Sequence, residues 1–271
     1  MTLTGTGYAK INLALHVRRR REDGYHELET LFAFARDGDA IAIDTDGAPG
    51  LTIDGPFSDA LAGEAGDDNL VMRAARALGR PAAIRLTKTL PIAAGIGGGS
   101  ADAAAVLRLL GEGHDEAELL AIAAGLGADV PACVASVPVR GDGRGDELRA
   151  IEAAGLSAMP LLLVNPRVPL STGPVFRAWD GRDRGALGEG DPLAVALAGR
   201  NDLEAPALGL CPVIGEVLAL LRAQDGVTLA RMSGSGATCF ALFESEAWRD
   251  AADAAIGNER PDWWRLATAL R

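Results

Sequence analysis

The most informative stretch of the chain runs Pro91-Ile-Ala-Ala-Gly95-Ile-Gly97-Gly98-Gly99-Ser100-Ala-Asp-Ala-Ala-Ala105. Four glycines and a serine come directly before a segment, Ala101 to Leu110, whose composition predicts a helix. Glycine lets backbone N–H groups approach an anion with no Cβ in the way, and a helix start adds unpaired N–H donors. Ser100 can cap that helix or reach a phosphate oxygen. The segment therefore predicts a phosphate-binding loop, with a plain glycine turn before a capped helix as the alternative.

The commoner phosphate-binding motifs do not describe this loop. A Walker A loop ends in Gly-Lys-Ser/Thr, and Ser100 stands where a Rossmann fingerprint has its third glycine. The chain also lacks the HRD and DFG motifs of protein kinases.

Composition and charge restrict the class of protein. The chain has 271 residues and a net charge of −11, which argues against a general binder of nucleic acid or anionic membrane. Three widely spaced cysteines form no metal or disulfide pattern, and the N-terminus does not resemble a signal peptide. The apolar stretch 119–139 is interrupted by glycine, proline and Asp129 and does not predict a membrane span. We therefore expect a soluble, cytoplasmic protein.

Strand and helix patterns alternate along the chain and predict an α/β or α+β protein. In the first predicted strand, Lys10, Asn12 and His16 share one face. The predicted strands are 8–17, 27–34, 39–44, 51–53, 83–87, 161–165 and 238–243, and the other predicted helices are 70–78, 116–126, 212–223 and 247–256. A polar, glycine-rich run at 140–147 predicts a boundary between two domains, 1–147 and 148–271.

Three segments together resemble the signatures of the GHMP kinases, the family of galactokinase, homoserine kinase, mevalonate kinase and phosphomevalonate kinase. They are Ala9-Lys-Ile-Asn-Leu13, the glycine-rich segment 91–105, and Met232-Ser-Gly-Ser-Gly-Ala-Thr-Cys239. They occur in the family's order and spacing, so the resemblance covers nearly the whole chain. It implies a two-domain α+β fold with an N-terminal ribosomal-protein-S5-like ATP-binding domain and a C-terminal α/β sandwich domain.

Within this family, three segments are similar to the members that act on a cytidine diphosphate-linked methylerythritol. They are Ala9-Lys10-Ile-Asn12, Asp23-Gly-Tyr-His26 and Gly127-Ala-Asp-Val-Pro131. The resemblance implies ATP-dependent phosphorylation of the 2-hydroxyl of that substrate in the non-mevalonate isoprenoid route. Mg²⁺ is expected with ATP, while the sequence shows no dedicated metal ligands. Another GHMP kinase and a catalytically silent sensor with this fold are the alternatives.

The resemblance gives Lys10 and Asp129 catalytic roles. Asp129 would accept the proton of the substrate hydroxyl, and Lys10 would keep that carboxylate ionised. Taken singly, Asp129 could be a helix cap and Lys10 a strand lysine extending to solvent.

The remaining roles are also implied by matching positions. The substrate would contact Asn12, Tyr25, His26, Thr172 and Phe176, with Tyr25 and Phe176 stacking on the pyrimidine and His26 reading its edge. A hairpin pair (Tyr25, His26) and a core phenylalanine (Phe176) are the structural alternatives. The nucleotide would contact Asn69, Leu70, Lys88, Pro91, Gly95, Gly97, Gly98, Gly99 and Ser100. The arginine run 18–21 is expected to be a solvated hairpin from which one arginine could reach a phosphate.

Overall fold

The computed structural model describes residues 1–61, 63, 65–153 and 155–271. They form two compact units, each built from segments distant in sequence. Unit 1 comprises Met1–Lys10, Asp37–Ile92 and Gly97–Ser136, and unit 2 comprises Ile11–Arg36, Ala93–Ile96 and Val137–Arg271. Two long strands, β1 (Thr2–Arg20) and β2 (His26–Asp44), pair with each other and contribute to both units.

Unit 1 combines one end of this hairpin with two short strands and four helices. Strand β4 (Ala83–Thr87) pairs antiparallel with β2 and parallel with β3 (Gly50–Asp54), and a short 3₁₀ turn, η1 (Ser58–Leu61), follows β3. The helices are α1 (Leu70–Ala77), α2 (Gly98–Leu110), α3 (Glu116–Leu126) and α4 (Val130–Ala135).

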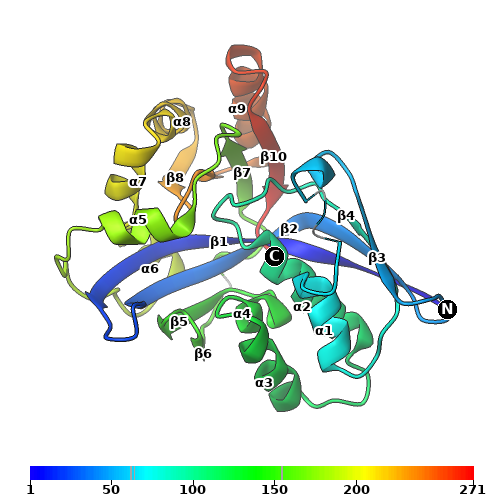
Figure 1. Cartoon of the computed structure of the whole chain (residues 1–271). Coiled ribbons are helices and arrows are strands. Elements are labelled where there is room, and N and C mark those ends of the chain that lie inside the picture. The colour runs from blue at the N-terminus through cyan, green and yellow to red at the C-terminus, as the bar shows by residue number, and fades with distance from the viewer. Residues whose placement is uncertain (62, 64, 154) are drawn as a thin grey trace. The chain divides into compact units, whose positions relative to one another are not determined.

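Helix α2 lies at the centre of the helical layer of unit 1, with α1, α3 and α4 packed around it (Figure 1). Every side chain from Ala101 to Leu107 is buried. Alanine-rich helices allow close helix contacts because their side chains are short. The start of α2 is therefore held by packing along the rest of the helix.

Unit 2 contains two antiparallel β arrangements. Strand β5 (Val139–Gly143) pairs with the first half of β2 and with β6 (Glu147–Ala150). A separate four-stranded sheet has the order β10-β7-β9-β8, formed by Trp264–Ala269, Pro160–Asn165, Cys239–Phe243 and Val227–Met232.

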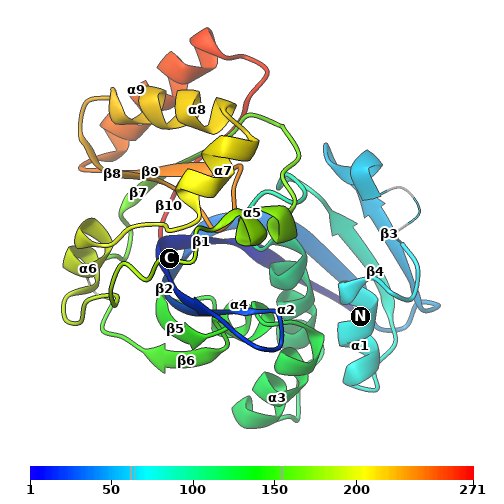
Figure 2. The ribbon, with the colours of Figure 1, turned by 60° about the vertical axis from the view of Figure 1, so that its left-hand side comes forward.

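Helices α8 (Val213–Arg222) and α9 (Glu246–Glu259) cover one face of the four-stranded sheet (Figure 2). Their buried side chains join alternate residues of the strands in one hydrophobic core. Three shorter helices, α5 (Thr172–Ala178), α6 (Pro192–Ala198) and α7 (Glu204–Leu210), complete the unit.

Two of the differences between the structure and the sequence-based elements concern β2 and the predicted domain boundary. The segments 27–34 and 39–44, predicted as separate strands, are one strand, β2, because Gly38 lets the backbone pass the neighbouring strand: a Cβ there would lie 1.9 Å from the carbonyl oxygen of Gly7. The polar run 140–147 is the hairpin β5–β6. The single domain boundary near residue 147 stays a prediction.

Candidate active site

The first group of candidate residues lies in unit 1 and centres on Lys10. Lys10 is 4% exposed on β1, and its Nζ lies 3.1 Å from Oδ2 of Asp129. Asp129 stands at the N-cap position of α4, yet its side chain makes no capping hydrogen bond. The carboxylate is 40% exposed, so it is paired with a buried ammonium group and still open to solvent. The geometry favours the catalytic interpretation of this pair over the helix cap and the solvent-extended lysine.

The glycine-rich loop packs directly against Lys10. Helix α2 begins at Gly98, three residues earlier than predicted, and Gly97 precedes it in the left-handed conformation with φ of 61°. A Cβ on Gly97 would lie 2.9 Å from Cε of Lys10. Ser100 therefore lies in the first turn of α2 and is not its cap. The first-turn N–H groups have no side-chain cap, which leaves donors for an anion beside Lys10.

The other predicted nucleotide contacts surround this loop within unit 1. Asn69 caps α1, because its side chain accepts a hydrogen bond from Val71 N at 3.0 Å. Leu70 lies in the first turn of α1, and a Cβ on Gly99 would be 3.8 Å from its Cδ1. Pro91 is buried at the start of the loop. Asn69 thus has a structural role of its own, and Leu70 offers an apolar surface next to the loop.

Lys88 does not extend into solvent beside the loop. It is 2% exposed, and its Nζ donates to carboxylate oxygens of Asp39 and Asp102. These hydrogen bonds are made inside the protein, beneath the loop, and the contact of Lys88 with nucleotide stays a prediction.

The second group of candidate residues lies in unit 2 and centres on His26. The imidazole is 9% exposed, with its ring centroid 4.9 Å from that of Phe176 and 5.7 Å from that of Trp179. Nε2 of His26 and Nε1 of Trp179 are buried without a hydrogen-bond partner among the described residues. Burial, and then the charge of Arg20, lower the pKa of His26, so the ring is neutral at physiological pH. A neutral imidazole beside an aromatic ring suits recognition of a base edge.

Tyr25 lies at the tip of the hairpin that carries His26. Its backbone N–H donates to Oδ1 of Asp23, and Gly24 adopts a positive φ of 86°, so the Asp-Gly turn forms as the sequence predicts. The side chain of Tyr25 is 55% exposed, and the guanidinium carbon of Arg144 lies 5.2 Å from its ring centroid. Tyr25 thus presents an exposed aromatic face, while His26 is buried.

The third glycine-rich segment contacts Asn12 and Gly95 within unit 2. The Asn12 backbone N–H donates to Oγ of Ser233 at 3.2 Å, and that hydroxyl donates to the carbonyl of Gly95 at 2.9 Å. The Asn12 side chain donates to Oγ1 of Thr30, and its Oδ1 is buried without a partner among the described residues. A buried amide oxygen without a donor is available to a hydroxyl of a ligand.

Thr172, at the start of α5, shares a hydrogen bond of 2.9 Å with Oγ of Ser235. The segment 232–239 therefore meets three predicted site residues of unit 2: Asn12, Gly95 and Thr172.

Comparison with known proteins assigns the family. Residues 69–136 match the model of the GHMP kinases N terminal domain, and residues 184–260 match that of the GHMP kinases C terminal. The chain is 66% identical to 4-diphosphocytidyl-2-C-methyl-D-erythritol kinase of Rhizorhabdus wittichii, over 99% of this chain and 94% of the relative. It is 56% identical to the protein of the same name from Novosphingobium aromaticivorans, over 100% and 94% of the two chains.

The chain belongs to the GHMP kinases. A crystal structure of 4-(cytidine 5'-diphospho)-2C-methyl-D-erythritol kinase superposes on it with a TM-score of 0.76 at 33% identity, covering 99% of both chains. A mevalonate kinase structure, 10% identical with a TM-score of 0.68, shares the fold. These matches confirm the two-domain α+β fold and the small-molecule kinase activity expected from the three motifs, and the kinase family implies ATP as the phosphate donor.

Several residues of this GHMP kinase site escaped the sequence analysis. Asp39 and Asp102 bind Lys88, and Trp179 packs on His26. Asp102 lies inside the quoted loop motif, where its carboxylate in an otherwise alanine-rich helix was an available signal. Asp39 and Trp179 gave none, because only the folded chain brings them to their partners.

All four arginines of the run have partners within the protein, and Nη2 of Arg19 lies 3.6 Å from Oε2 of Glu27. Arg18 pairs with Glu29 and Asp183, and Arg21 with Asp23 and Glu27. Arg20 donates to the carbonyl oxygens of Arg177 and Trp179 at the end of α5. Arg20 therefore anchors the helix that carries Phe176.

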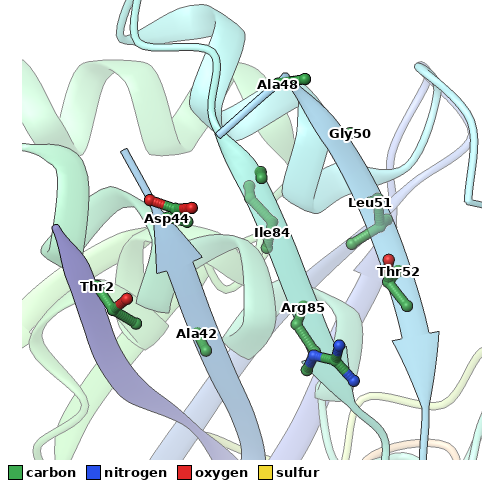
Figure 3. A pocket seen from close by; sticks show the side chains of 10 residues that line it. Thr2, Ala42, Asp44, Ala48, Gly50, Leu51, Thr52, Ile84 and Arg85 are labelled. Carbon is green, nitrogen blue, oxygen red and sulfur yellow. The ribbon is translucent and has the colours of Figure 1, made fainter. Parts of the chain in front are cut away.

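A hollow of about 430 Å³ opens on the sheet of unit 1 (Figure 3). None of the candidate site residues is among those that line it. Thr2, Ala42, Leu51, Ile84 and their neighbours line it. Its two charged side chains are already paired, Asp44 with the N-terminus and Arg85 with Asp54. The hollow therefore offers no free charge for a ligand.

Neither a metal cluster nor a membrane helix emerges from the part of the chain that the structure describes. No group of three or more His, Cys, Asp or Glu side chains is placed to hold a metal ion there. No helix within the same residues combines the length and the apolar character needed to cross a bilayer.

Proposed function

We propose that this chain transfers the γ-phosphoryl group of ATP to the 2-hydroxyl of 4-diphosphocytidyl-2-C-methyl-D-erythritol, in the cytoplasm, as a step of non-mevalonate isoprenoid biosynthesis. The observation that carries the proposal is the Lys10–Asp129 ion pair packed against Gly97 of the loop. The relatives that bear the name of this kinase support the identity of the substrate.

In unit 1, Gly97 to Ser100 at the start of α2 bind the phosphates of ATP, and Leu70 contacts the nucleotide nearby. Backbone N–H donors at a helix start suit an anion, and glycine admits it closely. Mg²⁺ accompanies ATP and neutralises charge on the transferring group when bound. Oxygen donors of the kind it prefers are present in Ser100 and Asp129.

Asp129 accepts the proton of the attacking hydroxyl. Its partial exposure leaves the carboxylate accessible, and the Lys10 ammonium, 3.1 Å away, orients it. Lys10 is placed against the loop, where its charge stabilises negative charge developing on the phosphoryl group.

In unit 2, His26 reads the edge of the cytosine and Phe176 and Tyr25 contact its faces. Asn12 offers its unpartnered Oδ1, and Thr172 its hydroxyl, to the methylerythritol diphosphate portion. Catalysis by a kinase is mostly positioning and charge stabilisation, so these contacts serve to orient the acceptor hydroxyl.

A substrate panel tests the proposal. Purified protein is assayed with ATP and, separately, the cytidine substrate, homoserine and mevalonate, with consumption of ATP and the position of the new phosphate followed by NMR. We expect turnover of the cytidine substrate alone, with phosphate at the 2-position. Preferred turnover of homoserine or mevalonate would identify another GHMP kinase, and ATP binding without turnover of any acceptor would identify a silent binding protein.

A further inference from the structure

Three charged side chains lie buried beneath the start of α2. Lys88 is 2%, Asp39 0% and Asp102 1% exposed. The Lys88 ammonium donates to Asp39 and, at 2.8 Å, to Oδ2 of Asp102. Unpaired buried charges are costly, so three of them in one cluster require mutual compensation.

The cluster ties together the two ends of the glycine-rich loop. On the side before the loop, Lys88 belongs to the cluster itself, and the backbone N–H groups of Thr89 and Leu90 donate to Oδ1 of Asp39 at 2.6 and 2.9 Å. On the side after the loop, Asp102 lies in the second turn of α2. Both ends are therefore joined through one ammonium group to Asp39 of β2.

The ammonium group also lies directly against the loop backbone. A Cβ on Gly98 would lie 3.3 Å from Nζ of Lys88 and 3.7 Å from Oδ2 of Asp39. Gly98 is the first residue of α2, where the N–H donors are unpaired. The position of Nζ thus determines where the anion-binding end of the helix sits.

We propose that Lys88, Asp39 and Asp102 form the positioning network of the ATP-binding loop, fixing both of its ends and holding one ammonium group against Gly98. The inference rests on the proposed function, in which this loop binds ATP. None of the three side chains touches the nucleotide, and each acts through the loop backbone.

Two variants of the full chain test the network. Asp102→Asn keeps the size of the side chain and an oxygen for Lys88 but cannot ionise, and Lys88→Arg forces a larger, planar cation into the space beneath Gly98. Ile41→Val, in the core of unit 1 on β2, is the control for a general loss of stability. ATP and CDP binding are measured by calorimetry, with KM for ATP and kcat determined in parallel.

We expect Lys88→Arg to raise Kd and KM for ATP by about 2- to 30-fold with unchanged CDP affinity, the size of coupling through residues that do not touch a ligand. Asp102→Asn should raise both in the same direction by a smaller factor, because it keeps an oxygen for Lys88 but not the negative charge. Wild-type ATP affinity in Lys88→Arg would overturn the inference. If Lys88→Arg does not fold, wild-type ATP affinity in Asp102→Asn overturns it instead. If disruption of Gly97 also leaves ATP binding intact, the proposed ATP site is wrong, which is a separate outcome.

Discussion

At the scale of single residues, the two side chains of the candidate catalytic pair differ in their exposure to solvent. Lys10 is almost fully buried, whereas its partner Asp129 is 40% exposed. A buried lysine held for packing alone would be expected to face a buried carboxylate with both oxygens hydrogen-bonded, as Lys88 does in Asp39. The side chain of Asp129 instead makes no capping hydrogen bond to α4 and remains partly exposed to solvent. An arrangement of this kind is suited to proton transfer from a bound hydroxyl.

Removal of the proton acceptor should therefore abolish most turnover without unfolding the protein. Asp129→Asn keeps the size of the side chain, and we expect kcat to decrease by about 10²–10⁴-fold, the usual loss of a general base. The measurement is steady-state kinetics with the cytidine substrate. Asp115→Asn is the matched control, because Asp115 caps α3 with its side chain and asparagine caps equally well. Near-normal turnover in Asp129→Asn would remove Asp129 from the mechanism.

At the scale of elements, the sequence predicted those whose signals are local. Strand 83–87 and helix 116–126 form with the predicted ends, and the helix predicted at 70–78 forms as α1 with Asn69 as its cap. The interruption predicted within β2 was wrong, because Arg36-Asp-Gly38 resembles a turn and only the contact with Gly7 keeps it extended. Strand β10 lacked a clear pattern, since its pairing with β7 comes from a partner about one hundred residues away.

The candidate site, too, could be predicted from the sequence where its signals are local. Residues inside contiguous motifs, such as Lys10, Asp129 and the loop glycines, could be predicted, and the structure brings them together within unit 1. The ammonium of Lys88 could not be placed, because its partners come from β2 and α2. A lysine next to a glycine-rich loop looks the same in sequence whether it binds the ligand or supports the loop.

The hairpin tip and α5 supply the two sides of the proposed cytosine contact, and they should contribute differently. Tyr25 is exposed and stacks on any base, so Tyr25→Ala should weaken binding of CDP and UDP by a similar factor. His26 is buried against Phe176 with Nε2 unpartnered, so His26→Ala should mainly reduce the preference for cytosine over uracil, by about 1–3 kcal/mol for one base-edge contact.

The check is kcat/KM for the cytidine substrate and its uridine analogue in both variants. His16→Gln is the control, because His16 is a buried histidine of the same unit whose two ring nitrogens face Gly185 and Arg200 of the protein. It should leave the ratio between the bases unchanged. A full cytosine preference in His26→Ala would assign the reading of the base to other groups.

At the scale of the whole molecule, the two groups of site residues belong to different compact units. Residues Gly97 to Ser100 of the loop, Lys10 and Asp129 lie in unit 1, whereas Asn12, His26 and Phe176 lie in unit 2. Each unit has buried residues and hydrogen bonds of its own around its group. Local disruption in one unit should therefore leave ligand binding by the other intact.

Gly97→Ala is the variant that separates the two binding functions. Gly97 has a φ of 61°, and an added Cβ would lie 2.9 Å from Cε of Lys10, so the loop or the lysine must move. Displacement of a catalytic group at a reacting centre reduces turnover by about 10²-fold. We expect ATP binding and turnover to decrease, while the affinity for CDP stays at the wild-type value.

Gly113→Ala is the matched control, since it also places alanine at a positive φ, 91°, but the nearest atom to its Cβ, on Arg80, is 3.9 Å away. Both variants carry similar backbone strain. Calorimetry with ATP and with CDP then isolates the effect of the contact with Lys10. Equal loss of ATP binding in the two variants would attribute the effect to backbone strain. Loss of CDP binding in Gly97→Ala would show that the two units do not bind their ligands separately.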